Sequence, residues 1–288
     1  MKKTIVAVGQ RLLWGVLLLG AAACHNEDEN TVPVQEEWVT VQDYELYTRT
    51  IGTATPQVVL ITGIGGSTDD FKSIEQRLGR FCTVINYDRE GLGRSAWQNK
   101  PKDSETIARE LNALLVQKHI TAPFILVAHS IGGLHARTFL ALYPEKVSGL
   151  VLIDPTPEDL TDTLIGQLPP EYQQPARDAM QQEFNQLLAS LPEGGVKEEY
   201  KAIEECYTQA RALTNSTAVP VQIISSMKVT DGASEASIAT AKQLRDALLN
   251  ELCTGAQKHT LTYNSGHFIQ KEAPQLVVDA IHWVLNNQ

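Results

Sequence analysis

The serine at position 130 stands in a segment whose composition suits nucleophilic chemistry. It lies in the run Ala128-His129-Ser130-Ile131-Gly132-Gly133, between a valine-rich stretch that predicts a strand and an apolar stretch that predicts a helix. A sharp turn from strand to helix lifts a serine hydroxyl above the sheet, and it needs small neighbours because larger side chains would collide there. A hydroxyl held in this way can attack an electrophilic carbon once a base has taken its proton.

His267 is the best candidate for that base. Imidazole suits the role because its unperturbed pKa lies close to neutral, so that it can take and return a proton. His267 follows Ser265-Gly266 in a predicted loop between the last strand and the last helix. The other histidines lack such a context, and we expect them to be ordinary surface or core residues: His25, His119, His129, His135, His259 and His282.

The segment around Ser130 resembles the nucleophile elbow of the α/β-hydrolases, Gly-x-Ser-x-Gly, with Ala128 in place of the first glycine. This family places its histidine in the loop that here holds His267. The turn Asp88-Arg89-Glu90-Gly91-Leu92-Gly93-Arg94-Ser95 is similar to another segment of the family. We expect that turn to be structural, because its glycines let the chain reverse close to the site. The resemblance runs from about residue 38 to the last residue and implies a serine hydrolase, without specifying its substrate.

A third residue, a carboxylate, is expected to orient the imidazole and to stabilise its protonated form. Most of the family places it after the next-to-last strand, here Val221 to Ile224, where Val229 stands at the expected position and Asp231 follows two residues later. Pancreatic-type lipases place it one strand earlier, where Asp154 closes the apolar run Val151-Leu152-Ile153. We favour Asp154 for its position at the sheet edge and keep Asp231 as the alternative.

Two backbone N–H groups are expected to bind the negative charge that develops on the substrate oxygen. One should come from Ile131, the residue after the nucleophile. The other should come from the loop Thr62-Gly63-Ile64-Gly65-Gly66, which follows an early strand as the family's His-Gly-x-Gly segment does, with Thr62 in place of the histidine. Ile64 is the predicted donor. The alternative is a glycine loop that serves tight turning alone.

Strand and helix patterns alternate along most of the chain. Short apolar runs such as Val58 to Thr62 and Phe124 to Ala128 are typical of buried parallel strands, and amphipathic segments such as Ser104 to His119 separate them. This alternation predicts an α/β fold, with a mostly parallel central sheet and helices on both faces. The predicted core comprises residues 37–154 and 219–288.

Residues 155–218 interrupt the alternation. They show no strand pattern, only Gln- and Glu-rich helical stretches, and they are far longer than the usual connection of about 2–6 residues in an α/β unit. We expect a helical cap over the carboxyl edge of the sheet, where such folds bind their ligands. A peripheral helical decoration is the alternative.

The N-terminus has the layout of an export signal. Basic residues precede an apolar run from Leu12 to Ala23, which is too short for a bilayer that needs about 20 residues. We predict a signal peptide at residues 1–23 and an acidic tether at residues 24–36.

The segment Leu19-Gly20-Ala21-Ala22-Ala23-Cys24 resembles a bacterial lipoprotein signal, in which the cysteine becomes the lipidated first residue, with Ala21 where leucine is usual. The acidic run Glu27-Asp28-Glu29 looks like the surface-export signal of Bacteroidetes-type lipoproteins. We expect a protein anchored in the bacterial cell envelope through acyl chains on Cys24. A periplasmic or secreted protein, cleaved after Ala23, is the alternative.

The composition excludes several kinds of partner and cofactor. A formal net charge of −10 disfavours binding to nucleic acid, which needs clustered Lys and Arg. The sequence has no metal-ligand cluster, phosphate loop or dinucleotide fingerprint, so we expect no cofactor. Besides Cys24 the cysteines are Cys82, Cys206 and Cys253, which form no disulfide framework. Cys206 and Cys253 either make one bridge or remain buried thiols.

The resemblance and the residues together predict a serine hydrolase that cleaves a carboxylic ester, or a small amide or thioester, through an acyl-enzyme intermediate. Serine at position 130 argues against epoxide hydrolase and haloalkane dehalogenase chemistry, for which the family uses an aspartate there. The expected partner is a small acyl substrate. The alternative from another class is a surface-binding lipoprotein that keeps the fold and is catalytically silent.

Overall fold

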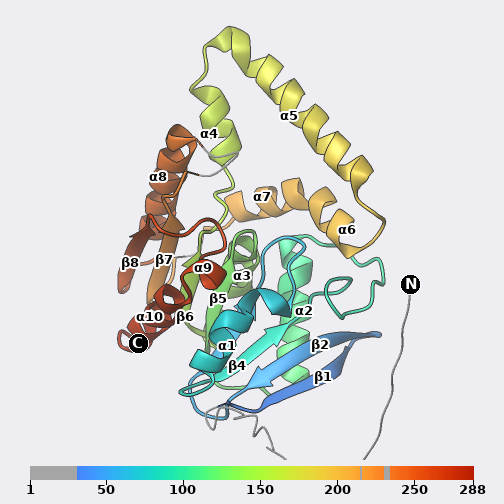
Figure 1. Cartoon of the computed structure of the whole chain (residues 1–288), viewed down its shortest axis with the longest axis vertical. Coiled ribbons are helices and arrows are strands. Elements are labelled where there is room, and N and C mark those ends of the chain that lie inside the picture. Colours follow the sequence, from blue (N-terminus) through green and yellow to red (C-terminus); the bar gives the residue numbers. More distant parts are fainter. Residues whose placement is uncertain (1–30, 215, 230–233) are drawn as a thin grey trace, which may run out of the picture. The chain divides into compact units, whose positions relative to one another are not determined.

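The computed structural model describes residues 31–214, 216–229 and 234–288. Within them the chain forms an eight-stranded sheet with the order β1-β2-β4-β3-β5-β6-β7-β8 (Figure 1). The pairs β1–β2 and β2–β4 are antiparallel and the other neighbouring pairs are parallel, which confirms the predicted mostly parallel sheet. The strands are β1 (Val34–Val41), β2 (Tyr44–Ile51), β3 (Gln57–Ile61), β4 (Thr83–Tyr87), β5 (Phe124–His129), β6 (Val147–Ile153), β7 (Val221–Ser226) and β8 (Gln257–Thr262).

The central strands are buried on both faces. Every residue of β5 is buried, and its sequence is almost entirely apolar, as expected for a strand covered by helices on both sides. β1 lies at one end of the sheet and mixes exposed with partly buried residues. It begins at Val34, which pairs with Ile51, so residues 34–36 of the predicted tether belong to the sheet.

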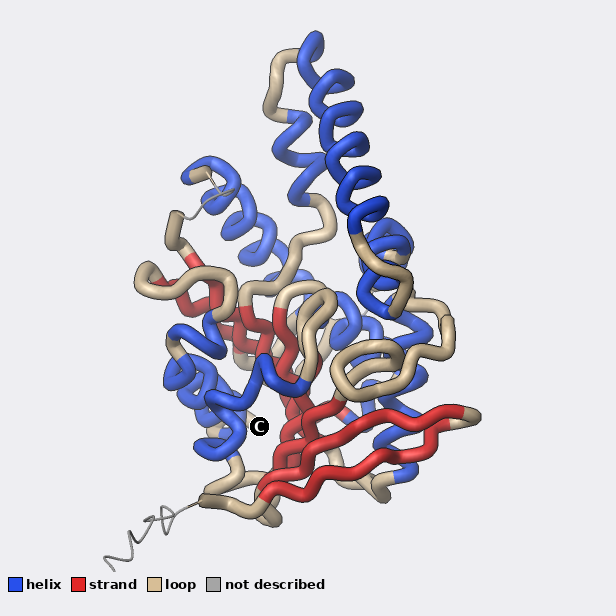
Figure 2. The backbone as a smooth tube through the Cα atoms, turned by 45° about the vertical axis from the view of Figure 1, so that its right-hand side comes forward, coloured by secondary structure: helices blue, strands red, loops and turns tan. Residues whose placement is uncertain are grey.

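Two apolar cores lie on opposite faces of the sheet (Figure 2). On one face α2, α3 and α8 cover side chains such as Leu126, and on the other α1 and α10 cover side chains such as Val127. Neighbouring residues belong to different cores because successive side chains of a strand point to opposite faces. The helices of the core are α1 (Lys72–Leu78), α2 (Ser104–Gln117), α3 (Gly132–Leu142), α8 (Glu235–Leu252), α9 (Ile269–Glu272) and α10 (Pro274–Leu285), with two short 3-10 helices, η1 (Thr68–Phe71) and η2 (Pro144–Lys146).

Four helices follow one another between β6 and β7 and gather beyond one edge of the sheet (Figures 1 and 2). We call them the insertion: α4 (Leu160–Gly166), α5 (Pro170–Ser190), α6 (Gly195–Lys201) and α7 (Ile203–Arg211). α7 packs on α3, where Cys206 and Ala210 are buried against Leu134. α5 has no buried residue. None of the described helices is both long and apolar enough to cross a membrane.

Gly132, at the start of α3, allows the helix to approach the end of β3 at backbone distance. A Cβ at this position would lie 2.6 Å from the carbonyl oxygen of Thr62 and 2.8 Å from that of Ile61. Both obstacles are backbone atoms, which cannot turn aside as a flexible side chain can. By contrast, a Cβ at Gly166 of α4 would meet nothing within 4 Å.

We therefore expect Gly132→Ala to lower the free energy of unfolding by about 1–3 kcal/mol, because the added methyl group forces β3 and α3 apart. Gly166→Ala is the matched control and should leave stability unchanged or raise it by up to about 1 kcal/mol, since alanine favours a helix over glycine. Urea unfolding followed by circular dichroism measures both. Equal stability of the two variants would contradict the close approach.

Candidate active site

The turn after β5 holds Ser130 in a left-handed backbone conformation. β5 ends at His129 and α3 begins at Gly132, so the turn lies where the sequence predicted it. Ser130 has a φ of +55°, a strained value for a residue with a side chain, which persists only where the surroundings impose it. Its N–H donates to the carbonyl of Ile153 at 3.0 Å, and its own carbonyl accepts from the N–H of Gly133 at 3.0 Å.

Asp154 and His267 meet at the same edge of the sheet. Asp154 is the first residue after β6, with a φ of +43° and 6% of its surface exposed. Nδ1 of His267, in the loop between β8 and α9, lies 2.7 Å from Oδ2 of Asp154, although 113 positions separate the two residues. The structure thus brings the predicted base into contact with the aspartate that we favoured as its partner.

The surroundings of Asp154 keep its side chain ionised. Its Oδ1 accepts from the guanidinium of Arg245 at 2.7 Å and from the N–H of Ser226 at 2.9 Å. Burial acts to raise the pKa of Asp154, but the hydrogen bond with His267 and the charge of Arg245 outweigh burial, and the pKa lies below its ordinary value. A carboxylate held in this way places the proton of His267 on Nδ1 and leaves Nε2 to accept another.

The hydroxyl of Ser130 is hydrogen-bonded to a neighbour other than His267. Its Oγ lies 3.3 Å from Oγ1 of Thr156, two residues beyond Asp154, and the N–H of Thr156 donates to the carbonyl of Ser130 at 3.3 Å. Within the described residues Ser130 makes no hydrogen bond to an imidazole. In enzymes without bound substrate, catalytic hydrogen bonds are often long or absent and form only when substrate binds. A hydrogen bond between Ser130 and His267 would then form in the complex with substrate.

His129, which we expected to be an ordinary histidine, ties the loop of His267 to the turn. Its Nε2 lies 2.9 Å from the carbonyl oxygen of His267, and the two rings are 4.6 Å apart. Burial and the neighbouring His267 lower the pKa of His129 to about 4, so its ring is neutral at neutral pH. Because His129 immediately precedes Ser130, this contact joins the backbone of the His267 loop to the turn that carries the serine.

Arg245 is a residue of the site that the sequence reasoning missed. It lies on α8 and is 6% exposed, and its guanidinium contacts Oδ1 of Asp154 and the carbonyl of Pro155. A signal for it does exist in the sequence. Arg245 stands four residues after Ala241 and four before Leu249, both buried, so it is a charged residue within the apolar face of a helix.

The two predicted N–H donors flank the serine from different elements. Ile131 follows Ser130 directly, and Ile64 lies in the loop Thr62 to Gly66 between β3 and η1, which we call the glycine loop. Gly63 abuts the turn, since a Cβ there would lie 3.2 Å from Cβ of Ser130. In the part of the chain that the structure describes, neither the N–H of Ile64 nor that of Ile131 donates to a protein acceptor.

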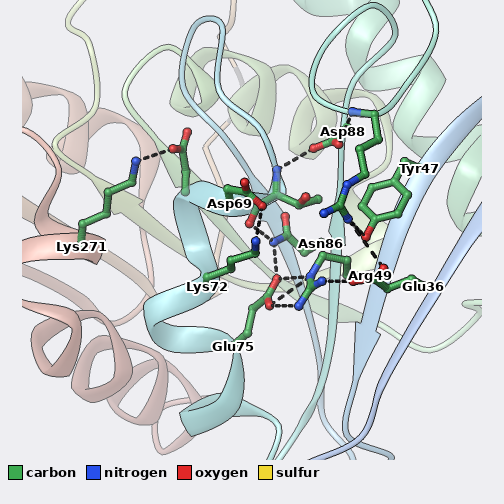
Figure 3. A network of polar contacts seen from close by, with 12 residues as sticks. Glu36, Tyr47, Arg49, Asp69, Lys72, Glu75, Asn86, Asp88 and Lys271 are labelled. Atoms are coloured by element: carbon green, nitrogen blue, oxygen red, sulfur yellow. Dashed lines mark hydrogen bonds and ion pairs between the residues drawn. The ribbon is translucent and has the colours of Figure 1, made fainter.

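A buried polar network fixes the chain just after the glycine loop (Figure 3). The carboxylate of Asp88 accepts from the N–H of Thr68 at 2.6 Å and from the N–H of Arg94 at 2.8 Å. The side-chain amide of Asn86 donates to the carbonyl of Thr68 at 2.9 Å and to the carboxylate of Glu75 at 2.6 Å. The start of η1 is thereby bound to the end of β4, which holds one end of the glycine loop in place.

Two predicted positions, Cys24 and Asp231, lie outside the described residues. Cys206 and Cys253 are both free and buried, so they form no bridge with each other. Burial raises the pKa of the Cys206 thiol to about 11. Among residues 31–214, 216–229 and 234–288, no group of His, Cys, Asp and Glu could hold a metal ion.

Comparison with known proteins matches residues 56–250 to the family described as the alpha/beta hydrolase fold. Over 101 residues the chain is 32% identical to a (lyso)-N-acylphosphatidylethanolamine lipase from Mus musculus, a match that covers 34% of this chain and 30% of that protein. The matches to curated relatives span less than half of those relatives' own length.

The solved structures that are similar over most of the chain include an esterase and an epoxide hydrolase. A thermophilic esterase from Thermogutta terrifontis is 18% identical with a TM-score of 0.60, and the match covers 88% of this chain and 98% of that one. The epoxide hydrolase CorEH is 19% identical with a TM-score of 0.63, over 88% of this chain and 99% of that one. At these identities the likeness shows a shared fold alone.

The buried ion pair of Asp154 with Arg245 should contribute to the free energy of unfolding. Asp154→Asn removes the carboxylate and leaves a buried guanidinium without its counter-ion, which should lower the free energy of unfolding by about 3–5 kcal/mol. Asp159→Asn, at an exposed carboxylate that pairs with Arg211, is the control and should cost less than about 1 kcal/mol. Urea unfolding at neutral pH measures both. A cost for Asp154→Asn no larger than the control's would show that the buried pair is not formed.

Proposed function

The chain belongs to the α/β hydrolase fold family, and we propose from its site that it is a serine hydrolase that cleaves a carboxylic ester, or a small amide or thioester, through an acyl-enzyme intermediate. The fold by itself does not select a reaction, because one fold hosts many chemistries. The observation that carries the proposal is the 2.7 Å contact between His267 and Asp154 beside a serine in a left-handed turn.

In the proposed reaction the oxygen of Ser130 attacks the carbonyl carbon of the substrate. Nε2 of His267 takes the hydroxyl proton, Asp154 stabilises the imidazolium, and the proton passes to the departing alcohol as its bond to the acyl group breaks. Water then attacks the acyl-serine and gives a proton to His267, which returns it to Ser130 as the acid leaves. For His267 to take this proton, the Ser130 hydroxyl has to give up its hydrogen bond with Thr156.

Ile64 and Ile131 are the proposed donors to the oxyanion that forms in both steps. The glycine loop adjoins the serine, and the two N–H groups make no other hydrogen bond to a described residue. Donors fixed in advance act on the transition state without reorganising, and each contributes about 3–4 kcal/mol in measured cases.

A serine at the nucleophile position supports an ester substrate, because serine forms an acyl intermediate that water can hydrolyse. The shared fold of CorEH, an epoxide hydrolase, adds nothing for epoxides, since the chemistry depends on the site and not on the fold. The name of the Mus musculus lipase also supports ester cleavage.

Labelling with a fluorophosphonate probe tests the nucleophile. We expect the wild type to gain the mass of one phosphonyl group, with fluoride displaced, and to hydrolyse p-nitrophenyl esters, and Ser130→Ala to do neither, because the attacking oxygen is gone. Ser225→Ala is a demanding control, since Ser225 is also hydrogen-bonded to a histidine, His259, at 2.8 Å, but is completely buried. This variant should label as the wild type does. An inert wild type would instead favour the catalytically silent binding protein.

Comparison of Asp154→Asn with Asp231→Asn identifies the acid. We expect Asp154→Asn to lower kcat about ten-thousand-fold, because an amide neither fixes the tautomer of His267 nor stabilises the imidazolium. Asp231→Asn should keep the wild-type kcat. The assay is run at a temperature at which circular dichroism shows both variants folded. The reverse outcome, a large loss for Asp231→Asn alone, would transfer the role to that residue.

A further inference from the structure

Helix α6 of the insertion sits against two loops of the core. Gly195 packs on the turn after β4, where a Cβ on Gly195 would lie 2.4 Å from the carbonyl oxygen of Gly91. Val196 packs on the glycine loop, where its Cγ1 would lie 3.3 Å from a Cβ on Gly65. Glu199, one helical turn further along, is 3% exposed. A single short helix therefore contacts both loops through closely packed residues.

Arg89 lies buried at the centre of this contact and has all its donors engaged. Its guanidinium donates to the carboxylate of Glu199 at 2.6 and 3.1 Å, to the carbonyl and hydroxyl oxygens of Thr62 at 2.8 and 2.9 Å, and to the carbonyl of Gly63 at 2.7 Å. The side chain of Arg89 is 1% exposed. Charges buried this deeply depend on each other, because the loss of either leaves the other uncompensated.

These contacts fix both peptide groups that adjoin Ile64. The carbonyl of Gly63 is held by Arg89, and because the peptide is planar and trans, the N–H of Ile64 points to the opposite side. The next N–H, that of Gly65, donates to Oε2 of Glu199 at 2.7 Å. One buried ion pair thus determines the direction of the proposed oxyanion donor.

We propose that Glu199 is a positioning residue for the glycine loop. It neutralises Arg89 and accepts the N–H of Gly65, and it thereby keeps the N–H of Ile64 directed at the substrate oxygen. This inference rests on the proposed function, in which Ile64 binds the oxyanion. It also makes the insertion a part of the catalytic geometry, because α6 cannot leave its place without breaking the ion pair.

The kinetic test compares two neighbouring glutamates of α6. Glu199→Gln keeps the size of the side chain and removes its charge, and we expect kcat for a p-nitrophenyl ester to fall about 10- to 100-fold with KM changed by less than about threefold, because the oxyanion contact acts on the transition state. Glu198→Gln is the matched control. Glu198 pairs with Lys201 at the surface, so its loss should leave kcat unchanged.

Hydrogen–deuterium exchange gives a second readout that needs no turnover. In Glu199→Gln the amides of the glycine loop should exchange faster than in the wild type, since the N–H of Gly65 loses a charged acceptor. In Glu198→Gln they should exchange at the wild-type rate.

A buried arginine without its counter-ion also weakens the fold, so a further variant separates stability from positioning. The double variant Arg89→Met/Glu199→Met replaces the ion pair with apolar side chains, a change that is often neutral for stability. We expect this double variant to melt within a few degrees of the wild type. Its kcat should nevertheless be as low as that of Glu199→Gln, because neither methionine can hold the glycine loop.

The outcomes distinguish this inference from the proposed function. If the wild type hydrolyses esters and Glu199→Gln keeps its kcat and its exchange rates, the inference is wrong and the proposed function stands. A rise in KM without a loss of kcat also overturns it, because Glu199 would then act in substrate binding. A wild type that neither hydrolyses esters nor reacts with the probe overturns the proposed function, and the role of Glu199 with it.

Discussion

The hydrogen bond between Nδ1 of His267 and Oδ2 of Asp154 is the contact on which the site depends, because it joins two strands that are not neighbours. β7 lies between β6, which ends just before Asp154, and β8, which precedes the loop of His267. The imidazole therefore has to reach across the end of β7. The N–H of Ser226, at that end, binds the other oxygen of Asp154 and holds the carboxylate where the imidazole can meet it.

Buried charges are paired across elements throughout this edge of the sheet. Arg245 of α8 binds Asp154, and Glu199 of α6 binds Arg89, so that helices from both the core and the insertion are attached to the loops that carry the proposed chemistry. An unpaired charge in such a place costs several kcal/mol. The helices and loops are therefore expected to move together or not at all, which favours a site that is largely formed before substrate arrives.

The sequence predicted the parts of the site that follow directly from strand ends. Ser130 directly follows β5 and Asp154 directly follows β6, and residues at the carboxyl ends of neighbouring parallel strands meet at one edge of the sheet. Glu199 and Arg245 could not be found in this way, since their contacts depend on how helices distant in the sequence pack. Arg89 belongs to a turn for which the sequence predicts a structural role, and the structure adds that its guanidinium donates to the hydroxyl of Thr62 in the glycine loop.

A crystal structure of the protein after reaction with a phosphonate ester tests the central claim most directly. We expect phosphorus bonded to Oγ of Ser130, the phosphonyl oxygen within about 3 Å of the N–H groups of Ile64 and Ile131, and the imidazole of His267 turned toward the bound oxygen while still hydrogen-bonded to Asp154. Phosphorus on a different residue, or an imidazole directed away from Ser130 in the adduct, would contradict it.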